Sequence, residues 1–174
     1  MNRITLKNIK FSEWNSEETN CFQADIYFDK KKVGLCSNEG HGGNTWCQWN
    51  DREDRPKYDE MLEYCKTLPP IIVEGMFGHE GFEIDANIEN ICDKLFEDWL
   101  KAKDDKKMKK NFEKGICFGD DYGYQISKFQ LGGKGITISE IVKTQQGIEH
   151  LKKVCAEKKN QGYKIFNTNL PFEV

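Results

Sequence analysis

Hydrophobic residues in the first third of the chain recur at every second position, which is the period of a β-strand. Residues 4–11 (ITLKNIKF) alternate roughly between apolar and polar side chains. A second run carries its apolar residues on one predicted face, namely Phe22, Ala24, Ile26 and Phe28. A polar turn at 29–32 (DKKK) then leads to a partner segment with Val33 and Leu35. The pattern predicts a strand followed by a β-hairpin.

Farther along, apolar residues take the spacing of an α-helix in two segments. The first contains Tyr58, Met61, Leu62, Cys65 and Leu68. Asp54 lies close to the expected N-cap, Pro56 fits the first turn, and the pair at 69–70 ends the helix. The second segment is a stronger stripe that consists of Ile88, Ile91, Cys92, Leu95, Phe96, Trp99 and Leu100. Between the two, the apolar and glycine-broken residues 71–85 predict a linker across the core.

The second predicted helix continues into residues 101–114 (KAKDDKKMKKNFEK), where seven lysines accompany three acidic residues. One interpretation is a solvated helix end, because charge runs solvate protein surfaces. The other is an electrostatic patch that attracts a phosphate-bearing or acidic partner. The candidate residues of this patch are Lys106, Lys107, Lys109 and Lys110.

The last third predicts strands around a third helix. Turn residues at 120–123 (DDYG) and 131–135 (LGGKG) indicate hairpins. A helix is expected to begin with Thr144 as its N-cap and to end with Gly162 as its C-cap. Its apolar residues are Ile148, Leu151, Val154 and Cys155. Residues 163–170 then alternate again as a short final strand.

These elements together predict an α+β fold. An antiparallel β-hairpin layer packs with about three helices, and a strand–strand–helix–strand block follows at the C-terminal end. We expect a single domain over residues 1–174, with a possible subdivision near 69–86.

Composition and charge narrow the classes of function. Aromatic residues make up 12% of the 174 residues, which indicates a folded chain. The net charge of −3 gives no overall attraction to nucleic acid, so direct nucleic-acid binding is disfavoured. No apolar run approaches the roughly 20 residues of a membrane span, and residues 1–11 lack the centre of a signal peptide. We therefore expect a cytoplasmic protein whose seven cysteines are reduced.

The most unusual stretch is residues 36–49 (CSNEGHGGNTWCQW), which admits three interpretations. Cys36, His41 and Cys47 have ligand chemistry, with a fourth zinc ligand from Cys21 or His79. Structural zinc sites use close pairs of ligands, which this spacing lacks. We therefore predict no metal and no cofactor.

The second interpretation is a site for a phosphate or nucleotide. Glycine frees the backbone, so successive N–H groups can converge on an anion, while indole rings can stack on a base. The candidate ligand-binding residues are Ser37, Asn38, Gly40, His41, Gly42, Gly43, Asn44, Trp46 and Trp49. The third interpretation is a long hairpin loop that only needs positive φ at several positions.

Catalysis has weak support in the sequence. His41 with Glu39, or His79 with Glu80, has the composition of an acid–base pair. No nucleophile with its own base is recognisable. We predict a protein without catalytic residues, and keep a metal-dependent hydrolase or nuclease as an alternative.

Much of the chain is similar to a family of uncharacterised small proteins from bacteriophages, prophages and plasmids. That family has a strand of the type S-x-E-T-x-x-F-x-A-x-x-Y, a short lysine turn and then G-x-x-S-N-x-G-x-G-G. The matching residues are Ser16, Glu18 (one position late), Thr19, Phe22, Ala24, Tyr27, Gly34, Ser37, Asn38, Gly40, Gly42 and Gly43. The C-terminal likeness covers 106–114, 115–128, 144–162 and 165–167. Cys36 and Cys47 do not belong to the pattern.

The resemblance implies a phage-type accessory protein that acts by binding and counteracts host defence. Its expected ligand is a nucleotide or another phosphate-bearing small molecule. The alternative is a protein–protein inhibitor whose aromatic and acidic residues dock on a host defence protein. A homo-oligomer is compatible with either hypothesis.

Overall fold

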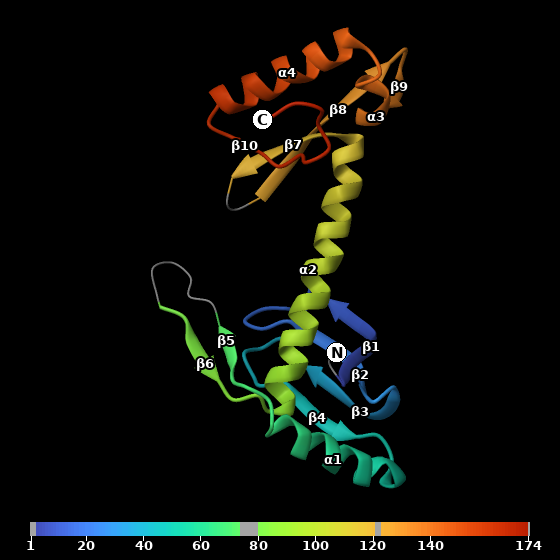
Figure 1. The fold of residues 1–174 in the computed structure, drawn as a ribbon, viewed down its shortest axis with the longest axis vertical. Helices are drawn as coiled ribbons and strands as arrows, with labels where there is room; N and C mark the ends of the chain where they lie inside the picture. The colour runs from blue at the N-terminus through green and yellow to red at the C-terminus, as the bar shows by residue number, and fades with distance from the viewer. Residues whose placement is uncertain (1–2, 74–79, 121–122, 174) are drawn as a thin grey trace. The chain divides into compact units, whose positions relative to one another are not determined.

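A computed structural model describes residues 3–73, 80–120 and 123–173. The chain has the predicted α+β fold, with helices beside antiparallel sheets (Figure 1). It divides into two compact units, which comprise residues 1–100 and 101–174. The division falls inside helix α2 (Ile88–Lys114), which contributes turns to both units.

The first unit is built on a four-stranded antiparallel sheet in the order β1-β2-β3-β4. Its strands are β1 (Ile4–Ser12), β2 (Cys21–Phe28), β3 (Lys31–Asn38) and β4 (Trp46–Trp49). The predicted hairpin is confirmed, because β2 and β3 pair around a two-residue turn. Asp29 and Lys30 in that turn both have positive φ, of 48° and 70°, as in the tight turns that suit twisted strands.

One face of this sheet forms the core of the first unit. Its predicted apolar residues on β2 are all buried. They pack against α1 (Arg55–Cys65) and the first turns of α2, and the rings of Phe22 and Phe96 stack with centroids 4.1 Å apart. A short 3-10 helix, η1 (Arg52–Asp54), precedes α1. Asp54, expected close to the cap, occupies the N-cap position, but its side chain makes no capping hydrogen bond.

The prediction of a linker after α1 is wrong for the described residues of this segment, which form two strands. Strands β5 (Ile71–Val73) and β6 (Phe82–Ile84) pair, with Ile71 opposite Ile84. Three residues are too few to show an alternating pattern, so the sequence did not reveal this hairpin. Residues 74–79, which include the candidate His79, lie outside the described residues.

The second unit contains the sheet β10-β7-β8-β9. Its elements after α2 are β7 (Gly115–Asp120), β8 (Gly123–Leu131), β9 (Lys134–Ile136), α3 (Ile138–Ile141), α4 (Gln145–Asn160) and β10 (Lys164–Ile165). Its core residues come from β7 and the two later helices: Ile116, Ile138, Ile141, Leu151 and Cys155. The sheet and α4 lie together in Figure 1.

The ends of the helices in the second unit follow local capping rules. The Thr144 hydroxyl accepts from the Gly147 N–H at 3.0 Å, which confirms it as the N-cap of α4. The C-cap is Gln161, one residue before the predicted Gly162, which has a φ of 87°. Helix α3 was not predicted, because four residues carry no periodicity; the Thr137–Glu140 capping box is its local signal.

Besides the pairing of β10 with β7, the buried side-chain amide of Asn167 holds the C-terminal segment to the sheet. The Asn167 Oδ1 accepts from the Cys117 N–H at 2.6 Å, and its Nδ2 donates to the Gly115 carbonyl at 3.1 Å.

Among the described residues, no helix has both the length and the apolar character needed to cross a membrane.

Candidate functional site

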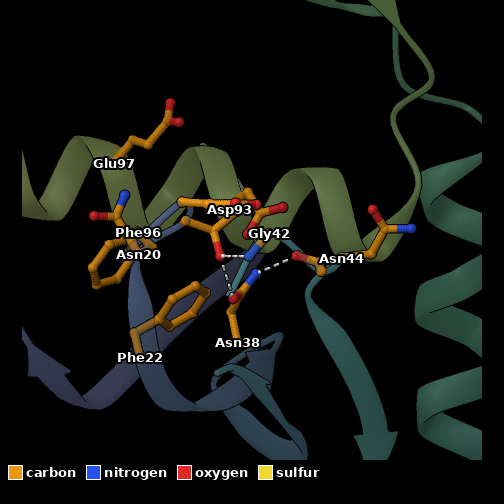
Figure 2. A pocket seen from close by; sticks show the side chains of 11 residues that line it. Asn20, Phe22, Asn38, Gly42, Asn44, Asp93, Phe96 and Glu97 are labelled. Atoms are coloured by element: carbon orange, nitrogen blue, oxygen red, sulfur yellow. Dashed lines mark hydrogen bonds between the residues drawn. The ribbon is translucent and has the colours of Figure 1, made fainter. Parts of the chain in front are cut away.

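A pocket of about 360 Å³ lies beside the loop that joins β3 to β4, where the core face of the first sheet meets α2 (Figure 2). Its walls come from the segment before β2, from the loop and from α2. The described lining residues are Glu18, Thr19, Asn20, Phe22, Asn38, Gly42, Gly43, Asn44, Asp93, Phe96 and Glu97. Four of the predicted ligand-binding residues are among them: Asn38, Gly42, Gly43 and Asn44.

Asn38 organises this loop. It pairs with Phe22 across the sheet, so its side chain lies on the face covered by α2. Its Oδ1 accepts from the Thr19 hydroxyl at 2.8 Å and from the Gly40 N–H at 2.9 Å. Its Nδ2 donates to the Gly43 carbonyl at 3.0 Å and to the Thr45 hydroxyl at 3.2 Å. An amide side chain offers two donors and two acceptor positions. All of them are therefore engaged within the protein.

The amides of two loop glycines already have internal partners. The Gly40 N–H donates to Asn38, and the Gly42 N–H donates to the Thr19 hydroxyl at 3.3 Å. The Gly40 carbonyl also accepts from the amides of Glu17, Glu18 and Thr19. The N–H groups of Gly40 and Gly42 are therefore not available to the predicted anion site, because both already donate hydrogen bonds within the protein.

The conformation of the loop explains its glycines. Gly40 and Gly42 have φ values of 92° and 86°, a region that favours glycine. A Cβ at Gly40 would collide with the Asn15 carbonyl, and one at Gly42 would collide with the Glu18 carboxylate. A Cβ at Gly43 would meet open space. The structure thus supports the interpretation of a loop that needs positive φ.

The two indoles of β4 lie on opposite faces of the sheet. Cys36 pairs with Cys47 and Gly34 pairs with Trp49, whereas Trp46 pairs with Ser37 on the other face. Trp49 packs on the core side, with its ring centroid 6.2 Å from that of Tyr58. Both indoles are partly exposed, Trp46 at 56% and Trp49 at 42%. Because they face opposite ways, they cannot sandwich a single base.

The histidine and cysteines of the stretch have separate environments. The exposed His41 ring approaches Glu17, with Nδ1 3.2 Å from Oε2, instead of the predicted Glu39. Cys36 is buried in the core, and the Cys47 sulfur lies 3.9 Å from that of Cys92. Neighbouring thiols and burial raise the pKa of Cys92 well above its usual range. Within the described ranges, no group of three or more suitable side chains could hold a metal ion.

The ionisable side chains that line the pocket are acidic. Glu18 comes from the segment before β2, while Asp93 and Glu97 come from successive turns of α2. No lysine or arginine is among the described lining residues. The Thr45 hydroxyl donates to Asp93 Oδ1. Burial nevertheless raises the pKa of Asp93, because the charged carboxylate loses water there.

A chain of hydrogen bonds leads to Asp93 from the loop. Asn38 donates to the Thr45 hydroxyl, and that hydroxyl donates to the Asp93 carboxylate. Thr45 is only 3% exposed, so this contact is shielded from solvent. The loop and α2 are thus connected directly, and the pocket keeps a defined wall.

The sequence did not reveal the acidic residues of this pocket. Asp93 and Glu97 lie more than 45 residues from the loop in the chain, and a helical pattern shows only which positions are apolar. The remaining candidates, Ser37, Gly40, His41, Trp46 and Trp49, are not among the described lining residues. The candidate lysines at 106, 107, 109 and 110 belong to the second unit, where all four are exposed on α2.

The chain was compared with models of protein families, with curated proteins and with solved structures, and none of them matches it.

Proposed function

We propose that this protein acts by binding, as a phage-type accessory inhibitor, and that its pocket takes an arginine or lysine side chain of a protein partner. This is the protein–protein hypothesis, with a host defence protein as the partner. The role in counteracting defence rests on the sequence resemblance. The choice of a cationic group rests on the pocket.

The carrying observation is the charge of the pocket wall. Three carboxylates, those of Glu18, Asp93 and Glu97, line it without a lysine or arginine among the described residues. A phosphate would be repelled there, while a guanidinium or ammonium group would be attracted and hydrogen-bonded. A bound cation would also stabilise the charged form of Asp93, which burial disfavours and whose pKa burial raises.

The size and floor of the pocket fit such a side chain. A volume of about 360 Å³ is at the small end of ligand pockets. The apolar side chains of Phe22 and Phe96 line the pocket (Figure 2). Lysine and arginine carry apolar stems below their charged ends, so they can use an apolar floor and a charged rim together.

A nucleotide is the second candidate, because carboxylates can also accept hydrogen bonds from the ring and amino N–H groups of a base. In this arrangement the base occupies the pocket and the phosphates stay outside, away from Glu18 and Glu97. It preserves the proposed sequestration of a nucleotide, but it does not use the amides of Gly40 and Gly42.

Titration followed by nuclear magnetic resonance distinguishes these ligands. N-acetyl-arginine amide and ADP would be added separately to isotope-labelled protein, with the backbone signals of residues 18–20, 42–44, 93 and 97 as the readout. We expect saturable shifts in this set with the arginine compound and none with ADP. Saturable shifts with ADP in the same set would support the nucleotide instead.

Charge-neutral variants show whether the carboxylates recognise the ligand. Glu18→Gln with Glu97→Gln keeps the side-chain shape and removes two charges, and should abolish the shifts. The matched control is Glu53→Gln, an exposed carboxylate of the same unit that is not among the described lining residues. Unchanged binding in the double variant would refute the proposed recognition.

A further inference from the structure

The small net charge of the chain conceals two units of opposite charge. Residues 1–100 contain 11 Lys and Arg and 20 Asp and Glu, a net charge of −9. Residues 101–174 contain 15 Lys and 9 Asp and Glu, a net charge of +6. The two values give the net −3 of the whole chain. A charge asymmetry of this size between two parts of a chain indicates that the basic part binds a polyanion.

The strongest concentration of positive charge in the second unit lies on α2. With about 100° of rotation per residue, five of its lysines fall within an arc of about 100°. This set, which we call the lysine stripe, consists of Lys103, Lys106, Lys107, Lys110 and Lys114. All five are exposed. The stripe runs for about 16 Å along the helix, at about 1.5 Å per residue.

The stripe lies on the side of the helix opposite the buried Phe112. Asn111 and Phe112 are buried. On the helix Phe112 lies about 180° around from Lys103, opposite the stripe, whereas Asn111 lies about 80° around, beside the stripe. Lys101 and Lys109, which are also exposed, project outside the stripe by the same geometry. Among the described residues, no ion pair engages Lys106, Lys107 or Lys110.

The arrangement favours a nucleic-acid backbone over a membrane surface. Double-stranded DNA presents one negative charge per roughly 1.7 Å of its axis, so a 16 Å row of lysines meets phosphates along its whole length. A membrane-bound helix needs an apolar face beside its cationic one. The only apolar side chains of 101–114 are Ala102, Met108 and Phe112, and Phe112 is buried inside the unit.

We propose that the lysine stripe of α2 binds the phosphate backbone of double-stranded nucleic acid without reading its sequence. This activity is independent of the acidic pocket, which belongs to the other unit. It also revises the expectation from net charge, because that expectation averaged over two units of opposite sign. Binding of this kind releases counterions and weakens as the salt concentration rises.

Fluorescence anisotropy of the full chain with a labelled DNA duplex tests the proposal. The duplex has about 20 base pairs of arbitrary sequence, and the salt concentration is raised from about 25 to 200 mM. If all five lysines meet phosphates, log K falls with log salt with a slope of about −4.5. Absence of binding at the lowest salt concentration would overturn the proposal.

Two matched double variants on the same helix locate the surface. Lys106→Gln with Lys110→Gln removes two charges from the stripe, and the slope should change to about −2.7. Lys101→Gln with Lys109→Gln removes two exposed charges outside it and should keep the parent slope. Circular dichroism confirms that both remain helical. Equal losses in the two variants would overturn the stripe as the site.

Alternative partners are tested in the same assay by competition. Unlabelled duplex should displace the labelled duplex more effectively than polyglutamate or vesicles that contain phosphatidylserine, each added at equal anionic charge. Stronger displacement by polyglutamate would identify an acidic protein as the better partner, and stronger displacement by vesicles would identify a membrane surface. Either result would overturn the assignment to nucleic acid.

Discussion

Replacement of Asn38 by alanine tests whether the loop beside the pocket is held by this one side chain. The substitution removes four hydrogen bonds at once, to Thr19, Gly40, Gly43 and Thr45. It leaves the Gly40 N–H and the Gly43 carbonyl without these partners. It also breaks the path from the loop to Asp93, because Asn38 no longer donates to Thr45.

The magnitude follows from the number and burial of these bonds. Each intramolecular hydrogen bond contributes about 1 kcal/mol net, and a polar group left unpaired in a buried place costs about 1–3 kcal/mol. Asn38 is 8% exposed, so water replaces its contacts only in part. We therefore expect Asn38→Ala to lower the free energy of unfolding by about 3–5 kcal/mol. That is a large share of the roughly 5–15 kcal/mol of a typical domain.

Urea denaturation followed by tryptophan fluorescence is the appropriate assay. All four tryptophans lie within residues 1–100, so the signal reports on the first unit. Asn44→Ala is the matched control, since it makes the same chemical change at an exposed position of the same loop. Its expected effect is within about 0.5 kcal/mol of the parent protein. If the two variants unfold at similar urea concentrations, the reasoning about the Asn38 network is wrong.

Three further predictions concern the same unit. Gly40→Ala should destabilise it by more than about 1 kcal/mol through positive φ and collision, whereas Gly43→Ala should change the unfolding free energy by less than about 0.5 kcal/mol. Asp93→Asn should stabilise the unit at neutral pH, because burial raises the pKa of the Asp93 carboxyl in the folded protein. Relative to the variant, the wild type is most stable below the pKa of an unfolded aspartate, about 4. The wild type loses this stability as the pH rises through the pKa of Asp93 in the folded protein. A pH-independent difference between the two urea midpoints would contradict this. Cys36 and Cys92 should resist a thiol reagent until the unit unfolds, while the partly exposed Cys21 reacts first, as peptide mapping would show.

The sequence predicted those elements that are long enough to repeat a period. The apolar faces of β2 and of α2 were readable because each extends over several repeats, and Thr144 was readable as a cap because its role is local. The hairpin of β5 and β6 and the single turn of α3 are too short for a repeat. Their existence depends on pairing and packing with distant residues.

The candidate site was predicted only in part, for a related reason. Gly40 and Gly42 indicated an unusual backbone conformation in the loop, and both have positive φ values. Composition could not show that Asn38 and Thr19 engage their amides, nor that α2 supplies Asp93 and Glu97 to the pocket. These are contacts between segments far apart in the chain, and they changed the expected charge of the ligand from negative to positive.

A crystal structure of the protein grown with both N-acetyl-arginine amide and ADP would test the central claim most directly. We predict the guanidinium group in the pocket, in contact with Glu18, Asp93 or Glu97, and no anion at residues 40–43. A phosphate held by the amides of Gly40 and Gly42, with their bonds to Asn38 and Thr19 broken, would contradict the account.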